Sequence, residues 1–321
     1  MKNSVELVEV WRGDYLECTH RGAAVIVDET GDIVESWGDP SEVILPRSSL
    51  KPLQALPLVS SGAAEAHSLS TKHLALACAS HQGQAMHTDR AAAWLDTLGL
   101  GNDDLQCGPQ WPDAQRTANE MVKAGEKPCR IHNNCSGKHC GFLTLGAHLG
   151  EAPERYLDPD GAVQQASKTA IEDLCGEDIL GHAIDGCSAP NFAISLTGMA
   201  RGMAKMGNHI LTQAMMAHPE LVAGDKRACT EMMQSMSGKA AVKTGAEGVF
   251  AAILPEKKMG IALKIEDGAT RASECVMAAL LVRMGVANPD DPTIAKRLNP
   301  IQRNRADLEV GVIKPSAALT D

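Results

Sequence analysis

The sequence predicts an α+β fold, in which an antiparallel sheet built from the terminal parts of the chain accompanies a central block of helices. Two observations support this fold class. β-Prone runs occur near both ends, whereas the long interval between them has apolar residues at helical spacing. No internal repeat, low-complexity tract or linker interrupts the 321 residues. We therefore expect one domain over residues 1–321, with a sheet part at about 1–47 and 245–321 and a helical part at about 48–244.

The first predicted elements are strands. Residues 4–11 are apolar and β-prone, and residues 22–37 contain two β-prone runs joined by Glu29-Thr30-Gly31-Asp32. A short polar turn between two such runs is typical of a hairpin. From Ser48 onward, helix-favouring segments follow one another with Gly, Pro and Asn between them. These predicted helices cover residues 48–60, 71–80, 87–98, 113–124, 137–149, 160–175, 189–206, 208–222 and 225–236.

Strands return near the C-terminal end. Residues 247–254 and 258–266 are β-prone, and Pro255-Glu256-Lys257 between them has the composition of a hairpin turn. A last helix is predicted over 269–286. The simplest closure pairs the terminal strands in one antiparallel sheet and covers one face with the last helix. The sequence leaves the place of the polar tail open, although Val310–Val312 is β-prone.

Composition excludes several classes of function. A net charge of −10 argues against nucleic acid and anionic membranes, which need a basic face on the protein. No apolar stretch approaches the roughly 20 residues of a membrane-spanning helix. The N-terminus lacks the apolar core of a signal peptide, so a cytoplasmic location is expected. In that compartment the ten Cys are expected to be reduced thiols or metal ligands.

A serine and a lysine stand three residues apart in LPRSSLKP, at the first predicted strand-to-helix boundary. Ser48 and Lys51 would share one face of a helix. A serine hydroxyl becomes a good nucleophile when a base takes its proton, and neutral lysine can be that base. This is the one Ser-x-x-Lys of the chain. The competing interpretation is a helix-capping serine followed by a solvated lysine.

Further polar residues accompany predicted element ends. Ser80 follows an apolar helix in HLALACASHQGQ, and Lys264 lies near the end of the second late strand. Each also has an ordinary interpretation, as a serine at a helix C-terminus and a solvated strand lysine. Lys243-Thr244-Gly245 precedes a strand and looks like the Lys-Thr-Gly of penicillin-recognising enzymes, although a lone tripeptide is a weak match.

Thiols and basic groups gather in IHNNCSGKHCGF. Cys135, Lys138, His139 and Cys140 fall within six residues, and Cys187 lies in a second loop, DGCSAP. Zinc binds thiolate, imidazole or carboxylate in a tetrahedral array, which such a cluster can supply. The chain lacks paired Cys-x-x-Cys motifs, so buried free thiols are an equally good interpretation.

Together these stretches resemble the Rhizobium-type L-asparaginases, the thermolabile asparaginase II family. The resemblance rests on six stretches taken jointly, because each alone is unspecific. The family is similar in fold to serine β-lactamases and glutaminases, which agrees with the strand–helix–strand order. The matching stretches, which span about residues 45–275, are PRSSLKPLQ, ACASHQGQ, HNNCSGKHCGF, DGCSAPNF, KTGAEGVF and ALKIEDGATRA.

The resemblance implies an amidohydrolase that converts L-asparagine to L-aspartate and ammonia, and it implies a homodimer. It assigns two catalytic serine–lysine pairs, Ser48 with Lys51 and Ser80 with Lys264, and Lys243 is the fallback for the last. It also implies a zinc site whose fourth ligand is water. The implied protein ligands of the zinc are Cys135, Lys138 and Cys187. Spacing alone would have nominated His139 or Cys140 in place of the lysine.

Substrate contacts are assigned from charge. Arg47 is the candidate for the substrate carboxylate, Asp185 for its ammonium or a metal-bound group, and His139 is a third candidate contact. Two alternatives stay open. One is a glutaminase or another β-lactamase-like acyl hydrolase, although the chain has no Ser-Asp-Asn and a glutaminase has no use for the Cys cluster. The other is a zinc-binding structural or ligand-sensing protein.

Overall fold

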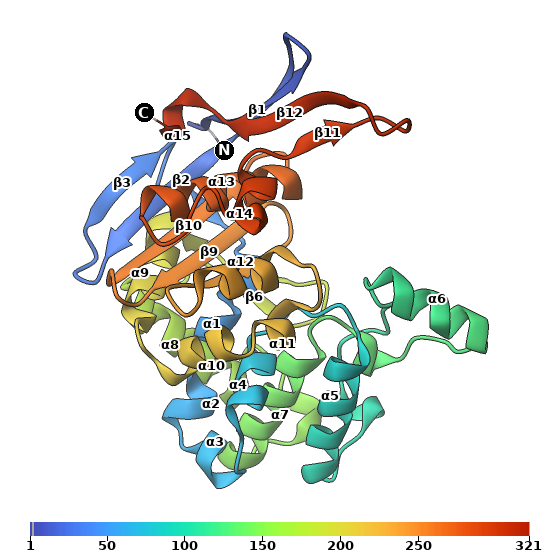
Figure 1. Ribbon diagram of the computed structural model, residues 1–321. Helices are drawn as coiled ribbons and strands as arrows, with labels where there is room; N and C mark the ends of the chain where they lie inside the picture. The colour runs from blue at the N-terminus through green and yellow to red at the C-terminus, as the bar shows by residue number, and fades with distance from the viewer. Residues whose placement is uncertain (2, 321) are drawn as a thin grey trace. The chain divides into compact units, whose positions relative to one another are not determined.

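The computed structural model describes residue 1 and residues 3–320 (Figure 1). The chain divides into two compact units, which we describe separately. The sheet unit comprises Met1–Ser49, Ile194–Gly207 and Glu231–Asp321, and the helical unit comprises Leu50–Ala193 and Asn208–Thr230. The expectation that one catalytic domain unites them stays a prediction.

The sheet unit confirms the predicted fold class. Its strands follow the order β11-β12-β1-β2-β10-β9-β8, with β3 also paired to β2, and each neighbouring pair is antiparallel (Figure 1). Strands from the two ends of the chain pair directly, β1 with β12 and β2 with β10. The strands are β1 (Val5–Arg12), β2 (Tyr15–Asp28), β3 (Ile33–Trp37), β8 (Ala241–Thr244), β9 (Val249–Leu254), β10 (Met259–Ile265), β11 (Ile301–Arg303) and β12 (Glu309–Pro315).

Two helices build the core of this unit against the sheet. Helix α9 (Leu196–Met206) and helix α13 (Thr270–Arg283) both pack on β9 and β10. Because successive strand side chains point to opposite faces, burial of every residue from Ala23 to Val27 means that both faces of β2 are covered. Gly260 lets α9 approach closely, since a side chain there would overlap the carbonyl oxygen of Ala200.

The smaller elements of the sheet unit lie around its edges. The short pair β4 (Val43–Ile44) and β7 (Ile194–Ser195) is antiparallel. Helices α14 (Pro292–Leu298) and α15 (Ala317–Thr320) pack on α13, which places the tail that the sequence left open. Between these two helices the tail forms β11 and β12 at the sheet edge.

The helical unit is organised around helix α7, which is buried without interruption over residues 136–146. Helices α2, α3, α4, α5 and α8 all contact it. The helices are α1 (Lys51–Gln54), α2 (Leu56–Ser60), α3 (Ala63–Ala66), α4 (Thr71–Ala77), α5 (Ala85–Thr97), α6 (Gln115–Ala124), α7 (Ser136–Leu149), α8 (Ala162–Cys175), α10 (Ile210–Ala217) and α11 (Pro219–Ala223). The hairpin of β5 (His182–Ile184) and β6 (Pro190–Phe192) belongs to the same unit, and α12 (Ala228–Met236) spans the boundary between the units.

Three predicted boundaries are wrong. The helix predicted over 189–206 begins at Leu196, because β6 and β7 occupy its first residues and the Ser195 hydroxyl caps the helix by accepting from the Gly198 amide. Strand β2 starts at Tyr15 rather than at residue 22. Its first residues are mostly polar, and their sequence pattern did not distinguish them from a loop. Residues 241–244, expected in the helical part, form strand β8.

None of the ten cysteines forms a disulfide among the residues that the structure describes. Over the same residues, no helix combines the length and the apolar character that crossing a bilayer requires.

The contact between α4 and α7 depends on a glycine. An added Cβ at Gly137 would overlap the carbonyl oxygen of Leu76, whereas one at Gly141 would meet its nearest atoms at 3.4 Å. We expect Gly137→Ala to lower the free energy of unfolding by about 2 kcal/mol or more, because backbone must move apart. Gly141→Ala is the matched control on the same helix and should stay within about 1 kcal/mol of wild type. Thermal denaturation of both variants tests this, and equal melting temperatures would contradict it.

Candidate active site

Four segments of the helical unit bring polar side chains together. Lys51 opens α1, Ser80 lies in the loop after α4, Cys135 precedes α7, and Cys187 lies in the β5–β6 loop. The Lys51 amine contacts the Ser80 hydroxyl oxygen at 2.9 Å and the Cys135 sulfur at 3.1 Å, and it donates to the carbonyl of Ala79. We call Lys51, Ser80, Cys135, Lys138, Asp185 and Cys187 the lysine–thiol cluster.

The second half of the cluster is centred on Cys187. The Lys138 amine lies 3.1 Å from the Cys187 sulfur, and an Asp185 carboxylate oxygen lies 3.4 Å from it. Lys51 and Lys138 are 1% and 4% exposed, so both amines are removed from bulk water. A lysine is rarely buried without partners, so these two depend on the groups they contact.

Backbone hydrogen bonds fix the loops of the cluster. The Ser80 amide donates to the Val222 carbonyl at 2.9 Å, and the His81 amide donates to the Asn134 carbonyl at 3.1 Å. The buried His81 ring also lies 2.9 Å from the Ser136 hydroxyl through Nε2. The two His81 contacts therefore join the Ser80 loop to the start of α7, through the residues on either side of Cys135.

The β5–β6 loop holds its site residues in a strained turn. Ser188 has a φ of +70°, which is uncommon for a residue other than glycine. The Ser188 amide donates to the Asp185 carbonyl, and the Asp185 amide donates to the Ala189 carbonyl, each at 2.9 Å. This tight turn presents the Asp185 carboxylate and the Cys187 thiol together. Backbone strain of this kind gathers at functional sites.

The two cysteines of the cluster shift each other's pKa. A hydrogen bond from the Cys135 thiol lowers the pKa of Cys187 to about 5, and the same bond together with burial raises the pKa of Cys135 to about 12. Burial opposes the charge of Lys138, yet the neighbouring Cys187, Cys135 and Asp185 raise its pKa above the usual value. The coupling therefore favours the thiolate at Cys187 and the thiol at Cys135.

The donor atoms of the cluster fit a zinc ion. The sulfur atoms of Cys135 and Cys187 and a carboxylate oxygen of Asp185 all lie within 4.8 Å of one another. The Lys138 nitrogen contacts one of these sulfurs, and it would bind a metal only as the neutral amine, which its raised pKa opposes until the metal displaces the proton. Zinc binds the thiolate and carboxylate donors of this set. Asp185 is the member that the sequence assigned to substrate rather than to the metal.

The two residues that spacing alone favoured as ligands have other partners. The Cys140 sulfur lies 3.8 Å from the Ala91 carbonyl oxygen on α5. His139 Nδ1 lies 2.7 Å from the Tyr156 hydroxyl, and burial lowers the pKa of His139 to about 3. His139 Nε2 is buried without a hydrogen-bond partner among the described residues. The neutral imidazole therefore keeps an unused polar atom next to Lys138 in the sequence.

The sheet unit supplies the other predicted residues. Ser48 lies in the 3₁₀ turn Arg47–Leu50, and Arg47 itself has a φ of +53°. Gly245 permits the loop after β8 to pass beside this turn, since a side chain there would lie 2.7 Å from the Pro46 carbonyl oxygen. An Arg47 guanidinium nitrogen lies 4.0 Å from a Glu247 carboxylate oxygen in that loop.

The backbone of the same loop also binds the side chain of Lys264, which lies in β10. Its amine donates to the Glu247 carbonyl at 2.8 Å and to the Ile265 carbonyl. Burial lowers the pKa of Lys264, which favours the neutral amine that a general base requires. The fallback residue Lys243 lies within β8 and donates to the Thr244 carbonyl at 2.8 Å.

The structure thus brings the predicted residues together in two groups. The helical unit gathers the six members of the lysine–thiol cluster, with His139 beside them. The sheet unit gathers Arg47, Ser48 and Lys264 around the loop that contains Glu247. The boundary between the units falls between Ser49 and Leu50, so Ser48 and Lys51 belong to different groups.

Sequence reasoning missed a hydrogen-bonded network beside Lys264, in which His20 is buried and Asp267 and Arg271 are exposed. Arg271 Nε donates to His20 Nε2 at 2.9 Å, so His20 carries its proton on Nδ1 and donates it to an Asp267 carboxylate oxygen at 2.6 Å. Asp267 also accepts from the Ala269 amide, so the network includes the turn that follows β10. Nothing in the sequence pointed to it, because His20 and Asp267 are 247 residues apart.

Comparison with protein families matches residues 8–315 to the model described as L-asparaginase II. The chain belongs to the L-asparaginase II family. The match covers nearly the whole chain and confirms the resemblance that the six motifs carried. Members of this family are amidohydrolases by name, so the small-molecule amide class of substrate follows for the chain. No curated protein sequence matches the chain.

Solved structures similar to this asparaginase II family chain are distant. A β-lactamase from Mycobacterium bovis shares 13% identity at a TM-score of 0.41, covering 82% of this chain and 94% of that one. A structure of Mglu in its native form shares 12% identity at a TM-score of 0.49, covering 88% and 69%. An octameric penicillin-binding protein homologue from Pyrococcus abyssi shares 14% at a TM-score of 0.36, covering 84% and 74%. Likenesses at this level carry no argument about function.

Proposed function

We propose that this member of the L-asparaginase II family hydrolyses the side-chain amide of L-asparagine to L-aspartate and ammonia. The observation that carries the proposal is the buried Lys51 amine, 2.9 Å from the Ser80 hydroxyl, in a chain whose family match covers residues 8–315. A lysine desolvated next to a serine has the arrangement of a base that activates a hydroxyl nucleophile.

The proposed reaction proceeds through an ester to serine. Lys51 takes the proton of the Ser48 hydroxyl as its oxygen attacks the amide carbon. The carbon–nitrogen bond then breaks, and the departing nitrogen receives a proton that passes from Lys51 through the Ser80 hydroxyl, leaving as ammonia. Water hydrolyses the ester and restores Ser48. Lys264 is proposed to pair with Ser80 in this relay, and its lowered pKa favours the neutral amine that can take up and release a proton.

Substrate charges are matched by the residues around these groups. Arg47 is proposed to attract the substrate carboxylate, and Asp185 its ammonium, with His139 Nε2 as a neutral contact. Cys135, Lys138 and Cys187 would hold zinc, which when bound supplies a fixed positive charge at this place. Because the nucleophile is a serine, activation of water by the metal is not part of the proposal.

Two assays test the proposal together. One measures ammonia release from L-asparagine and from L-glutamine, and the other measures turnover of nitrocefin. We expect kcat/KM to be highest for L-asparagine by at least about tenfold, since one extra methylene typically changes transition-state binding by 1–3 kcal/mol. Preference for L-glutamine or nitrocefin would support the glutaminase or β-lactamase-like alternative. Absence of turnover, with zinc bound, would support a structural or ligand-sensing protein.

The setting of the enzyme is part of the same proposal. We place the protein in the cytoplasm as a homodimer that acts on a small molecule, without nucleic-acid or membrane partners. The net charge of −10 supports the exclusion of polyanionic partners.

A further inference from the structure

Gln54 is a polar residue of the helical unit that neither sequence reasoning nor the proposed reaction uses. It is the last residue of α1, three positions after Lys51, and residues at that spacing share one face of a helix. Its side chain is only 4% exposed. The Gln54 backbone carbonyl accepts from the Ser167 hydroxyl, but among the described residues its side-chain amide has no hydrogen-bond partner. The amide atoms are not among the fully buried polar atoms that lack a partner, so they reach accessible space and are expected to meet water or a ligand there.

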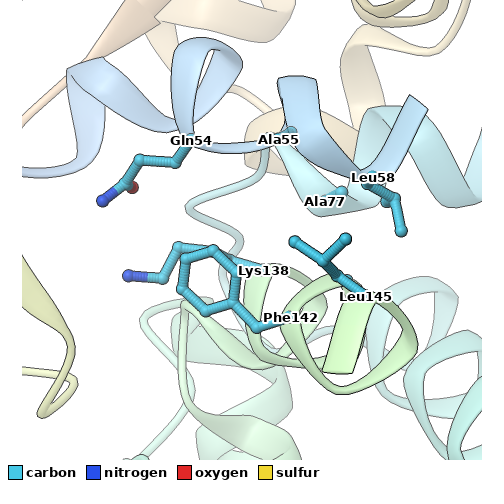
Figure 2. A pocket seen from close by; sticks show the side chains of 8 residues that line it. Gln54, Ala55, Leu58, Ala77, Lys138, Phe142 and Leu145 are labelled. Carbon is cyan, nitrogen blue, oxygen red and sulfur yellow. The ribbon is translucent and has the colours of Figure 1, made fainter. Parts of the chain in front are cut away.

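Figure 2 shows where the Gln54 amide points. Gln54 and Lys138 are the polar residues that line one small pocket, whose volume of about 10 Å³ leaves room for about one water molecule. The apolar part lies between Ala55, Leu58 and Phe142, and both polar side chains extend away from it toward the same side (Figure 2). On that side the Lys138 amine contacts the Cys187 sulfur of the lysine–thiol cluster. The Gln54 amide therefore faces the polar space that the cluster borders.

The charges next to Gln54 select what it would bind. Lys138 shares its pocket, and Lys51 lies one turn before it on the same helix face, whereas the acidic members of the cluster are reached through the Lys138 amine. A carboxylate is attracted to these two amines. An amide N–H can donate to the carboxylate, with a fixed direction that amines on flexible stems do not impose.

We propose that the side-chain amide of Gln54 donates a hydrogen bond to the α-carboxylate of the substrate and so helps select α-amino acid amides. The inference rests on the proposed function and deepens it. Gln54 is then a specificity-determining residue: it contacts the part of the substrate that does not react.

Two competing ligands separate the groups of the substrate. Succinamate keeps the α-carboxylate of asparagine and lacks its amine, whereas 3-aminopropanamide keeps the amine and lacks the carboxylate. Their inhibition constants are measured against L-asparagine in the wild type and in Gln54→Met, which keeps the length of the side chain and removes the amide. We expect the constant for succinamate to rise about 10- to 100-fold, the effect of one hydrogen bond to a charged group. The constant for 3-aminopropanamide should change less than about threefold.

Gln164→Met is the matched control, because Gln164 is a fully buried glutamine of the same unit whose amide donates to the Tyr156 carbonyl. It should leave both constants within about threefold of wild type. Comparing two ligands on one enzyme preparation cancels any loss of folded protein. A parallel rise for both ligands, no rise for either, or a rise for 3-aminopropanamide alone overturns the inference.

The two levels of the argument fail separately. If the wild type releases no ammonia from L-asparagine, the proposed function fails and the assignment of Gln54 to its substrate fails with it. If the wild type is active and Gln54→Met leaves the succinamate constant unchanged, only the assignment of Gln54 fails.

Discussion

Replacing Ser48 with alanine should lower kcat for L-asparagine by at least about a thousandfold, because it removes the oxygen that forms the ester. KM should change much less, since the substrate contacts proposed for Arg47, Asp185 and Gln54 remain. Steady-state ammonia release measures both constants. A Ser48→Ala variant that keeps more than about a tenth of the wild-type kcat would remove Ser48 from the nucleophile role.

Two other serines make this experiment decisive. Ser49 is the adjacent residue, fully buried, and its hydroxyl donates to the Pro46 carbonyl. Ser49→Ala should therefore affect stability and leave kcat within about threefold. Ser80 is the serious competitor, because its hydroxyl lies 2.9 Å from the Lys51 amine. If Ser80→Ala abolishes turnover while Ser48→Ala does not, or if a trapped acyl group maps to Ser80, the two serines exchange roles in the proposed reaction.

The order of strands and helices could be predicted because local pattern determined it. Alternating or continuous β-prone runs marked β9 and β10, and the short polar segment between them permitted one connection, an antiparallel hairpin. The helix predicted over 189–206 failed where local pattern and tertiary contacts disagree. Residues 190–195 pair with β5 and β4, and neither partner was visible in the sequence.

The candidate site was predictable to the extent that its members are neighbours in sequence. Cys135 and Lys138 stand one turn apart at the start of α7, so their convergence follows from helix geometry. The contact of Lys138 with Cys187 joins residues 49 positions apart, and family resemblance rather than spacing supplied it. Gln54 was missed for a different reason: a glutamine in a helix is ordinary, and only its burial without a partner marks it.

The cluster makes a second large effect testable, the loss of bound metal when a thiol is removed. Zinc should copurify with the untagged wild type at about one equivalent per chain, because two thiolate ligands bind it tightly. Cys187→Ala removes the sulfur that contacts both Lys138 and Asp185, and elemental analysis should then find less than about a tenth of an equivalent. Cys140→Ala is the matched control, since the Cys140 sulfur faces the Ala91 carbonyl on α5, and its metal content should stay at that of the wild type.

Kinetics of the same variants separate a positioning role of the metal from a chemical one. With serine as nucleophile and lysine as base, the proposed steps need no metal-bound hydroxide. Loss of the metal should therefore loosen the loops around Cys135 and Cys187 and raise KM by a larger factor than it lowers kcat. Equal metal content in Cys187→Ala and the wild type would leave Cys187 as a plain thiol beside Lys138. A collapse of kcat at unchanged KM in the metal-free enzyme would instead place the metal in the reaction itself and overturn the serine–lysine mechanism.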